Sequence, residues 1–395
     1  MASAPKTAPT NGPALRWARI TRGLSAEIAA QRLGITTVDL ENMETGDNQP
    51  SVGLLSQMSR VYRRPQGVLL LPFAPATDPL PTDFRTVGGA GSALGEETLR
   101  AIFEAPHVQH FVSELVEIEP ELIRASNLPE YSVGDSPEAA GEGERIRLDV
   151  SQAAVLGAGP GRKTFYGWRT RLQDLGILVL LKSFPVQDCR GLSLTGENLV
   201  PAIRVTSQDS NNGLTFSLIH EYAHLLLRQP GSCIPGSYRS DSVPAEPWCN
   251  RFAAAFLSPE TDLLREVRMS VGDKSDQSWT TYDIHNVATR FRMSDFAMAL
   301  RLKAVGITSA FDRIRDDLYA GDYKPKTGGG GGGETRTETR VRENGTAAIT
   351  TIVDAVNMDV VEAGEACEML GLDTSRLAEL DLIARKQKRD QSFMV

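Results

Sequence analysis

The chain has 395 residues, of which 41% are hydrophobic and 23% are charged, and it carries a net charge of -8. This is the composition of a globular protein with two or three domains, and it excludes a polycation that would seek nucleic acid without specificity. Four cysteines without CxxC spacing argue against a disulfide framework. Without an apolar run of membrane-spanning length or a signal-like N-terminus, we expect a cytoplasmic protein that makes no membrane contact.

After a disordered tail at residues 1–12, residues 13–73 predict an all-helical domain, with a first helix at residues 14–21. Ser25 is a suitable N-cap for a helix over residues 26–33. Gly34 ends this second helix. Thr36 caps a third helix that runs to about Met43 and is closed by Gly46, and Ser51 caps a fourth helix that runs to Val61.

Two short helices joined through a glycine-containing turn form a helix-turn-helix. The residue pattern of this stretch resembles the Xre/Cro type of helix-turn-helix. The matching residues are Leu24-Ser25, Ala29, Leu33-Gly34-Ile35, Glu44-x-Gly46 and Pro50-Ser51.

The third of these helices would be the DNA-reading helix. It offers Thr36, Thr37 and Asn42, with Arg32 nearby, as DNA-binding candidates. The same helix contains no Arg or Lys and carries acidic residues, which disfavours its insertion into a phosphate-lined DNA groove. Protein contact or dimerisation is the alternative use of this domain.

Residues 74–98 are rich in Pro, Ala and Gly and indicate a linker. Residues 99–123 have helical periodicity. His107 and His110 in that helix are interpreted as surface or packing residues. The acidic, turn-rich stretch at residues 132–145 predicts a loop.

The next segments predict an α+β domain at residues 99–320 with its core at residues 160–310. A helix at residues 168–175 is followed by short strands at residues 177–181, 189–194 and 201–206. The edge of such a small sheet can pair with an extended peptide substrate.

His220, Glu221 and His224 form the pattern His-Glu-x-x-His, which indicates a zinc-binding helix. Histidines four residues apart lie one turn apart on one helix face, so both imidazoles can reach one metal ion. Glu221 is placed to accept a proton from the attacking water. We expect a turn at residues 211–213 before this helix and a stop at Pro230-Gly231. The alternative is a core helix with two surface histidines.

A catalytic zinc site usually has three protein ligands, so one further ligand is expected elsewhere. Glu246, at the start of a helix over residues 247–257, is the candidate, and Cys249 or Cys233 would compete with it. We interpret Cys249 as a buried apolar residue. Asn250 can support a ligand by hydrogen bonding, or it can be a packing amide.

This second segment resembles the ImmA/IrrE family of metallopeptidases. Glu246, Asn250, Phe252-Ala253-Ala254 and Leu257-Ser258-Pro259 follow the family pattern in order. The likeness extends over about residues 160–310 and includes Gly176-Ile177, Arg190-Gly191-Leu192-Ser193, Pro201-Ala202-Ile203, Arg301-Leu302 and Gly306-Ile307. It implies one Zn²⁺ per chain held by His220, His224 and Glu246, with Glu221 as the catalytic base.

The resemblance also implies a zinc-dependent endopeptidase that cleaves one transcriptional repressor, after DNA damage or in a mobile element. The alternative function is a regulator or antirepressor that binds DNA or a partner protein without cleaving it. Candidates for stabilising the oxyanion are Tyr222, Tyr238 and Arg239. The sequence leaves the repressor and the oligomeric state open.

Downstream, helices at residues 282–290 and 295–305 form a pair with a turn at residues 292–294. Six consecutive glycines, Gly328–Gly333, place a flexible linker at residues 321–345. Residues 346–395 then predict a small helical module, with helices at residues 346–366 and 376–386.

Overall fold

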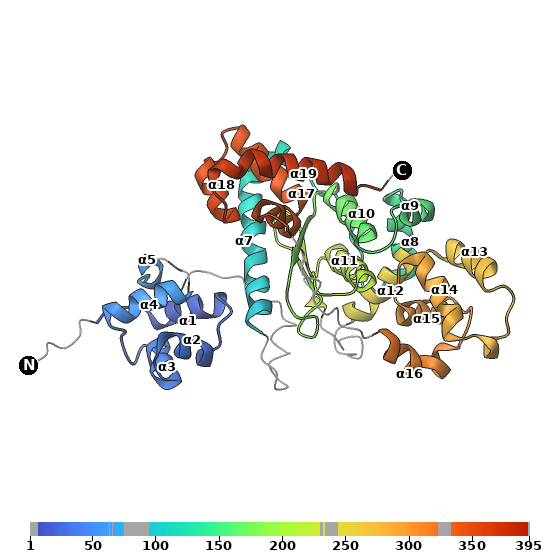
Figure 1. Ribbon diagram of the computed structural model, residues 1–395, viewed down its shortest axis with the longest axis horizontal. Coiled ribbons are helices and arrows are strands. Elements are labelled where there is room, and N and C mark those ends of the chain that lie inside the picture. Colours follow the sequence, from blue (N-terminus) through green and yellow to red (C-terminus); the bar gives the residue numbers. More distant parts are fainter. Residues whose placement is uncertain are drawn as a thin grey trace, which may run out of the picture. The chain divides into compact units, whose positions relative to one another are not determined.

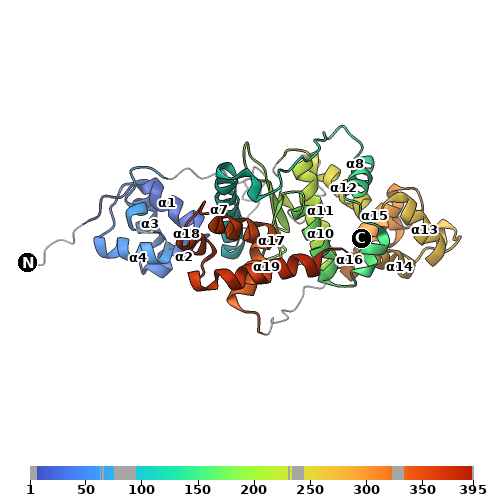
Figure 2. The same ribbon diagram turned by 90° about the horizontal axis from the view of Figure 1, so that it is seen from above.

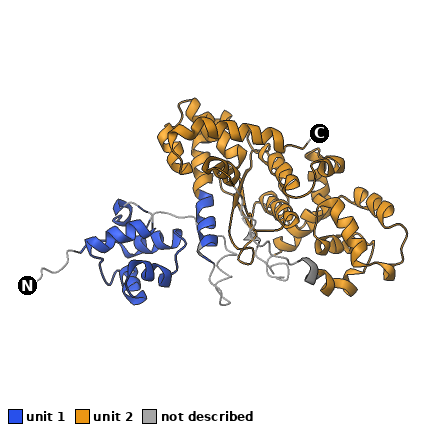
Figure 3. Cartoon of the chain, in the orientation of Figure 1, with its two compact units in different colours: residues 1–106 blue, residues 107–395 orange. Residues whose placement is uncertain are grey.

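The computed structural model describes residues 7–62, 64, 66–74, 95–229, 232–233, 244–322 and 333–393. The chain divides into two compact units, residues 1–106 and residues 107–395 (Figure 3). The boundary lies at Pro106, inside a long helix. None of the described helices is long and apolar enough to cross a membrane.

The first unit begins with the predicted all-helical domain. Ser25 accepts a hydrogen bond from the Ile28 amide and Gly34 adopts the left-handed conformation, so the second helix has the predicted bounds. The third helix runs two residues past the predicted end and stops at Gly46. The helices are α1 (Gly12–Thr21), α2 (Ala26–Leu33), α3 (Thr37–Thr45), α4 (Val52–Tyr62) and α5 (Gln66–Leu69) (Figure 1).

A core of its own stabilises this helical domain. Fully buried side chains from three helices, Leu15, Leu40 and Met58, meet in one cluster. The predicted disordered tail at residues 1–12 is wrong at its end, because Thr7 forms an isolated bridge with Ser51, Ala8 is buried in this core and α1 already begins at Gly12. The all-α prediction is therefore confirmed for this part of the chain.

The predicted helix after the linker is present as α7 (Glu96–Ile118), and a 3₁₀ turn at Pro120–Leu122 follows it. In the second half of α7, Gln109 donates to the carbonyl oxygens of Leu194 and Val200. This half of α7 is thereby attached to the sheet of the second unit. Most of the predicted linker, residues 75–94, lies outside the described residues.

The second unit contains a mixed four-stranded sheet in the order β1-β3-β2-β4. β1 pairs with β3 in parallel, whereas β2 is antiparallel to both of its neighbours. Gly191 of β2 lies opposite Val205 on one side and opposite Cys233 on the other. The strands are β1 (Leu178–Lys182), β2 (Gly191–Leu194), β3 (Ala202–Thr206) and β4 (Ser232–Cys233).

The helices α10 (Arg162–Gln173) and α11 (Asn211–Leu226) pack on this sheet through the main apolar core. α10 begins six residues before the predicted start. The predicted turn at residues 211–213 is wrong, because Ser210 caps α11 and these residues form its first turn. The α+β class is confirmed.

The predicted loop at residues 132–145 is also wrong, because most of it belongs to α8 (Pro137–Arg147). Ser136 caps this helix and Pro137 occupies its first turn. A methyl group at Gly141 would lie 2.5 Å from the Phe252 carbonyl oxygen, so this glycine permits close packing against the helix that carries Phe252. Glycine here allows helix contact and does not mark a turn.

Six further helices among the described residues belong to the same unit. The predicted helical pair is confirmed as α14 and α15, with Arg292 in the left-handed conformation between them. The helices in this part are α9 (Gln152–Gly157), α12 (Ala245–Leu257), α13 (Glu260–Ser270), α14 (Thr281–Phe291), α15 (Asp295–Ala304) and α16 (Phe311–Asp322), with a 3₁₀ turn at Asp276–Ser278.

The C-terminal segment packs on the α+β domain. α17 lies along β1, and α17 and α19 lie side by side in both views (Figure 1, Figure 2). The predicted helix at residues 346–366 ends at Asn357. Of the predicted linker at residues 321–345, residues 323–332 lie outside the described residues. The prediction is wrong for residues 336–345, because Thr335 caps α17 and these residues form its first turns. The elements are α17 (Arg336–Asn357), α18 (Ala363–Leu370), a 3₁₀ turn at Thr374–Arg376 and α19 (Leu377–Gln391).

A kink at Gly345, with a φ of 82°, interrupts α17 beside the sheet. A methyl group at Gly345 would lie 2.7 Å from the Val179 carbonyl oxygen in β1. Arg169 of α10 donates to that same carbonyl and also to the carbonyl of Arg342. Glycine is needed here because the backbone is left-handed and the neighbouring backbone is close.

Candidate metal centre

Three buried side chains from α11 and α12 converge on one point. The Nε2 atoms of His220 and His224 are 3.2 Å apart. Oxygen atoms of Glu246 lie 3.4 Å from the first imidazole nitrogen and 3.2 Å from the second. The side chains predicted as ligands are therefore brought together.

These separations match those of a metal coordination shell. Ligand atoms that bind zinc at about 2.0–2.1 Å in a tetrahedron lie about 3.3–3.4 Å from one another. Among the described residues that offer His, Cys, Asp or Glu ligands, this is the group of three within 4.8 Å of one another. Two imidazoles and one carboxylate form a donor set that suits zinc.

The α11 helix places its two histidines through its regular period. His220 is 0% exposed and His224 is 2% exposed, because their helix runs through the main core. On the opposite side of α11, Tyr222 is fully buried, and its hydroxyl donates to Glu144 at 2.5 Å and accepts from Arg147 at 2.7 Å. This anchoring fixes the rotation of α11 about its axis.

Tyr222 therefore contacts α8 and is held away from the convergent ligand atoms. Burial, followed by the nearby Glu144 carboxylate, raises the pKa of Tyr222 well above its ordinary value. Its suggested role in stabilising an oxyanion is not supported by these contacts. The other two candidates, Tyr238 and Arg239, lie outside the described residues.

Glu246 lies in the first turn of α12, as the following Pro247 requires. Burial alone would raise the pKa of Glu246, but hydrogen bonds with His220 and His224 outweigh burial and hold this pKa well below its ordinary value. The carboxylate form favoured in this way is the form that binds a cation.

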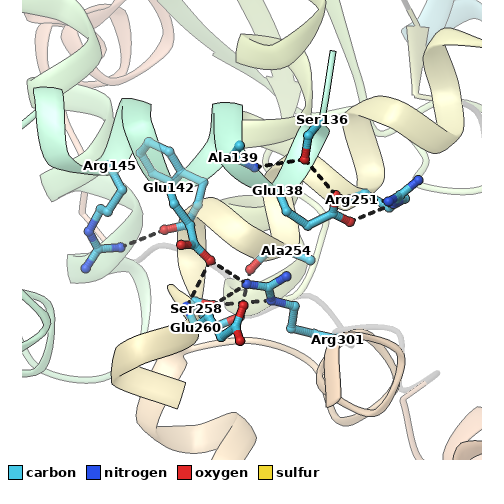
Figure 4. A network of polar contacts seen from close by, with 11 residues as sticks. Ser136, Glu138, Ala139, Glu142, Arg145, Arg251, Ala254, Ser258, Glu260 and Arg301 are labelled. Atoms are coloured by element: carbon cyan, nitrogen blue, oxygen red, sulfur yellow. Dashed lines mark hydrogen bonds and ion pairs between the residues drawn. The ribbon is translucent and has the colours of Figure 1, made fainter. Parts of the chain in front are cut away.

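A network of polar contacts holds α12 at a defined position (Figure 4). Arg301 of α15 donates to Glu142 of α8 and to the Ser258 carbonyl at the end of α12. Arg145 of α8 donates to the Phe256 carbonyl in the last turn of α12. With these contacts at its C-terminal end, α12 presents its first turn to α11.

Asn250 lies one turn after Glu246 and contacts a ligand directly. Its Oδ1 is 3.1 Å from Nδ1 of His220. An amide oxygen can only accept, so His220 donates from Nδ1, and in the neutral imidazole this leaves the lone pair for a metal ion on Nε2. Nε2 is the atom that faces Glu246 and His224. Cys249 is buried and is not among the convergent ligand atoms.

Glu221 is 0% exposed and lies against β2. A methyl group built on Gly191 would be 2.9 Å from Cγ of Glu221 and 3.0 Å from its Oε1. The Cys189 thiol donates to the Gly191 carbonyl at 2.9 Å. Burial first, and then the Glu221 carboxylate, raise the pKa of that thiol well above its ordinary value. Sequence reasoning gave neither Cys189 nor Gly191 a role.

Comparison with known protein families agrees with this geometry. Residues 172–303 match the model of the IrrE N-terminal-like domain, a peptidase family. The chain contains an IrrE N-terminal-like peptidase domain. Residues 12–71 match a helix-turn-helix domain, so the combination suggested by the sequence is present. No curated protein and no solved structure matches the chain significantly.

The peptidase family and the convergent His220, His224 and Glu246 point to a metallopeptidase. Helix-turn-helix domains are common in DNA-binding proteins, and the N-terminal match places this chain among proteins with such a domain. A protease-type regulator is the coarse function that both matches support.

The DNA-binding candidates lie on or next to α3. Thr36 is exposed, but its hydroxyl donates to Asp39 at 2.6 Å and accepts from the Asp39 amide, so it is engaged in capping. Thr37 and Asn42 are half-buried, and Arg32 is exposed on α2. Val38 is 63% exposed at the start of α3.

Proposed function

We propose that this protein is a zinc-dependent endopeptidase that cleaves a specific transcriptional repressor and so relieves repression. The observation that supports it most is the set of ligand separations, 3.2 to 3.4 Å, among His220, His224 and Glu246. A helix-turn-helix domain on the same chain supports a regulatory task rather than bulk digestion.

Each residue of the centre has a defined task in this proposal. His220 and His224 hold the cation through neutral nitrogen atoms, and Glu246 adds a compensating negative charge. Bound there, the cation would acidify a water molecule and polarise the scissile carbonyl. Glu221 takes a proton from the attacking water and passes it to the leaving amine. Asn250 keeps His220 in the tautomer that can bind.

The decisive experiment is the variant Glu221→Gln, co-expressed with candidate small Xre-type repressors from the same genome. Because the ligands are intact, the variant should retain one zinc per chain, as measured by atomic emission. Cleavage of the repressor should fall about 10² to 10⁴-fold, which is the usual contribution of a general base. Glu368→Gln, an exposed position on α18, is the matched control. Full cleavage by Glu221→Gln would refute the proposed mechanism.

A second candidate function is a regulator that binds DNA or a partner protein without cleavage. It is favoured by the complete burial of Glu221, to which a substrate carbonyl must gain access. The same co-expression distinguishes the two functions. A stable complex without a zinc-dependent fragment would support the binding function, whereas a fragment would support the peptidase.

A further inference from the structure

We propose that Gly191 is a positioning residue for the catalytic base. By lacking a side chain, Gly191 leaves the space in which the Glu221 carboxylate is held beside the metal ligands. This inference rests on the proposed peptidase function and adds a residue from the sheet to a centre otherwise built from two helices.

The first support is the contact between β2 and α11. A Cβ atom at Gly191 would lie 2.9 Å from Cγ of Glu221 and 3.0 Å from its Oε1. Ordinary carbon contacts begin at about 3.5 Å, so a methyl group there would overlap the carboxylate side chain. Glu221 is 0% exposed, so its side chain can relieve the overlap only by displacing the groups packed around it.

The second support is that the backbone does not itself require glycine here. Gly191 is the first residue of β2 and is not among the described residues with positive φ. Glycine inside a strand weakens the strand, and it commonly marks a place where another group approaches closely. At Gly191 the approaching group is the Glu221 side chain.

The third support is that β2 is fixed relative to α11. Arg190 forms an ion pair with Asp209 at 2.9 Å, immediately before α11. Gly213 in the first turn of α11 allows that pair to approach, because a methyl group there would lie 2.7 Å from Cγ of Asp209. The Arg190 carbonyl also accepts from the Thr206 amide, which ties it to β3. These contacts hold β2 in place, so we expect the Glu221 side chain, and not the strand, to move when a methyl group is added at Gly191.

The contact is tested first by stability, in the metal-free full-length protein. Gly191→Ala should lower the Tm when Glu221 is present. In the Glu221→Ala background, which removes Cγ and the carboxylate, the same change should cost clearly less, and the remaining cost should come from its 3.2 Å approach to the Arg204 carbonyl oxygen. Double-mutant cycles of this kind isolate a pairwise contact. Equal Tm losses in both backgrounds would overturn the contact.

The positioning role is tested with acetohydroxamate as the probe on the zinc-loaded protein. This small ligand chelates the metal and donates a proton to a neighbouring carboxylate, so its Kd reports where Glu221 lies. Gly191→Ala should keep one zinc per chain and weaken the ligand about tenfold, as expected for one lost hydrogen bond to a charged group.

Rescue and control variants separate positioning from general loosening. Glu221→Asp withdraws the carboxylate by one methylene, so in the Gly191→Ala background it should cause little further loss of affinity or recover part of it. Gly167→Ala in α10 places a methyl group against the Phe393 ring, so it should lower the Tm but leave hydroxamate affinity unchanged. An unchanged affinity in Gly191→Ala would overturn the proposal. If the unmodified protein bound no zinc, the proposed function would fail instead, while the stability cycle would still report the contact.

Discussion

Each unit of this molecule buries a cluster of ionisable side chains, and the two clusters differ in how their members pair. In the helix-turn-helix domain, Arg19 of α1 and Glu44 of α3 form a bidentate pair at 2.6 and 2.8 Å. In the peptidase domain, His220, His224 and Glu246 direct three ligand atoms at one point.

The difference lies in whether each charged group finds an opposite charge within the protein. The Arg19–Glu44 pair is neutral, and Arg19 also donates to the Leu24 carbonyl, so the cluster requires no further partner. The three ligand atoms of the peptidase domain offer lone pairs to one point and include one carboxylate. Burial of charge therefore marks a binding site only where the buried groups share one chemical character, here that of electron-pair donors.

The largest expected effect is the loss of the ligand cluster. His224→Ala should reduce zinc from one per chain to none and abolish repressor cleavage, because two ligands hold the ion poorly. The stabilisation by zinc should disappear with it, and that stabilisation is about 4 kcal/mol when zinc exceeds its Kd a thousandfold. His285→Ala, an exposed histidine paired with Asp295 on the helical pair, is the control. Retention of stoichiometric zinc by His224→Ala would contradict the site.

Removing one partner of the Arg19–Glu44 pair should affect stability and not zinc binding. Glu44→Ala leaves the Arg19 guanidinium buried without its carboxylate, which should destabilise the helix-turn-helix domain by about 3–5 kcal/mol. Chemical denaturation followed by circular dichroism measures this loss, and zinc content should not change. The double variant Arg19→Met/Glu44→Leu should lose much less. If the single variant were as stable as the unmodified protein, the pair would not be a structural element of this domain.

A smaller effect is expected for the amide that supports a ligand. Asn250→Ala should weaken zinc binding about 10- to 100-fold, the usual cost of removing a partner from a metal-binding histidine. Competition with a chromophoric chelator gives this affinity. Asn250→Asp, which keeps an acceptor oxygen, should retain most of it. Equal zinc affinity in Asn250→Ala and the unmodified protein would assign Asn250 to packing alone.

The smallest effect is expected away from both clusters, at the cap of α14. Burial raises the pKa of Asp283, but hydrogen bonds from Lys274 and Thr280 outweigh it, so the net shift is downward. A lowered carboxyl pKa contributes stability above the ordinary value of about 3.9, and that stability is lost as pH falls through the lowered pKa. Asp283→Asn should reduce the denaturation midpoint at pH 7 and have less effect at pH 3. An identical loss at both pH values would contradict this linkage.

The helices with clear cap signals were predictable from the sequence. Ser25, Gly34 and Thr36 fixed the bounds of α2 and the start of α3 because capping is a local interaction. The pairing of His220 with His224 followed from the helical period. The position of Glu246 in its first turn followed from Pro247, since proline has no amide hydrogen to donate.

Features that depend on contacts between distant segments were not predictable. Gly141 resembled a turn residue in an acidic stretch, yet it lies in α8, where it lets α12 approach. Gly191 belonged to a strand motif, but its relation to Glu221 exists only after β2 packs on α11. The packing of α17 along β1 was likewise not predictable, because no local pattern in residues 336–357 indicates which strand this helix contacts.

The packing of α17, the helix kinked at Gly345, on β1 has a consequence for biosynthesis. β1 lies about 160 residues before the helix that flanks it, and four of its five residues are buried. A ribosome therefore delivers the histidines and Glu246 well before it delivers the helix that completes the surroundings of Val179. An unfinished chain can therefore contain His220, His224 and Glu246 while β1 is still uncovered on the side where α17 packs in the finished protein.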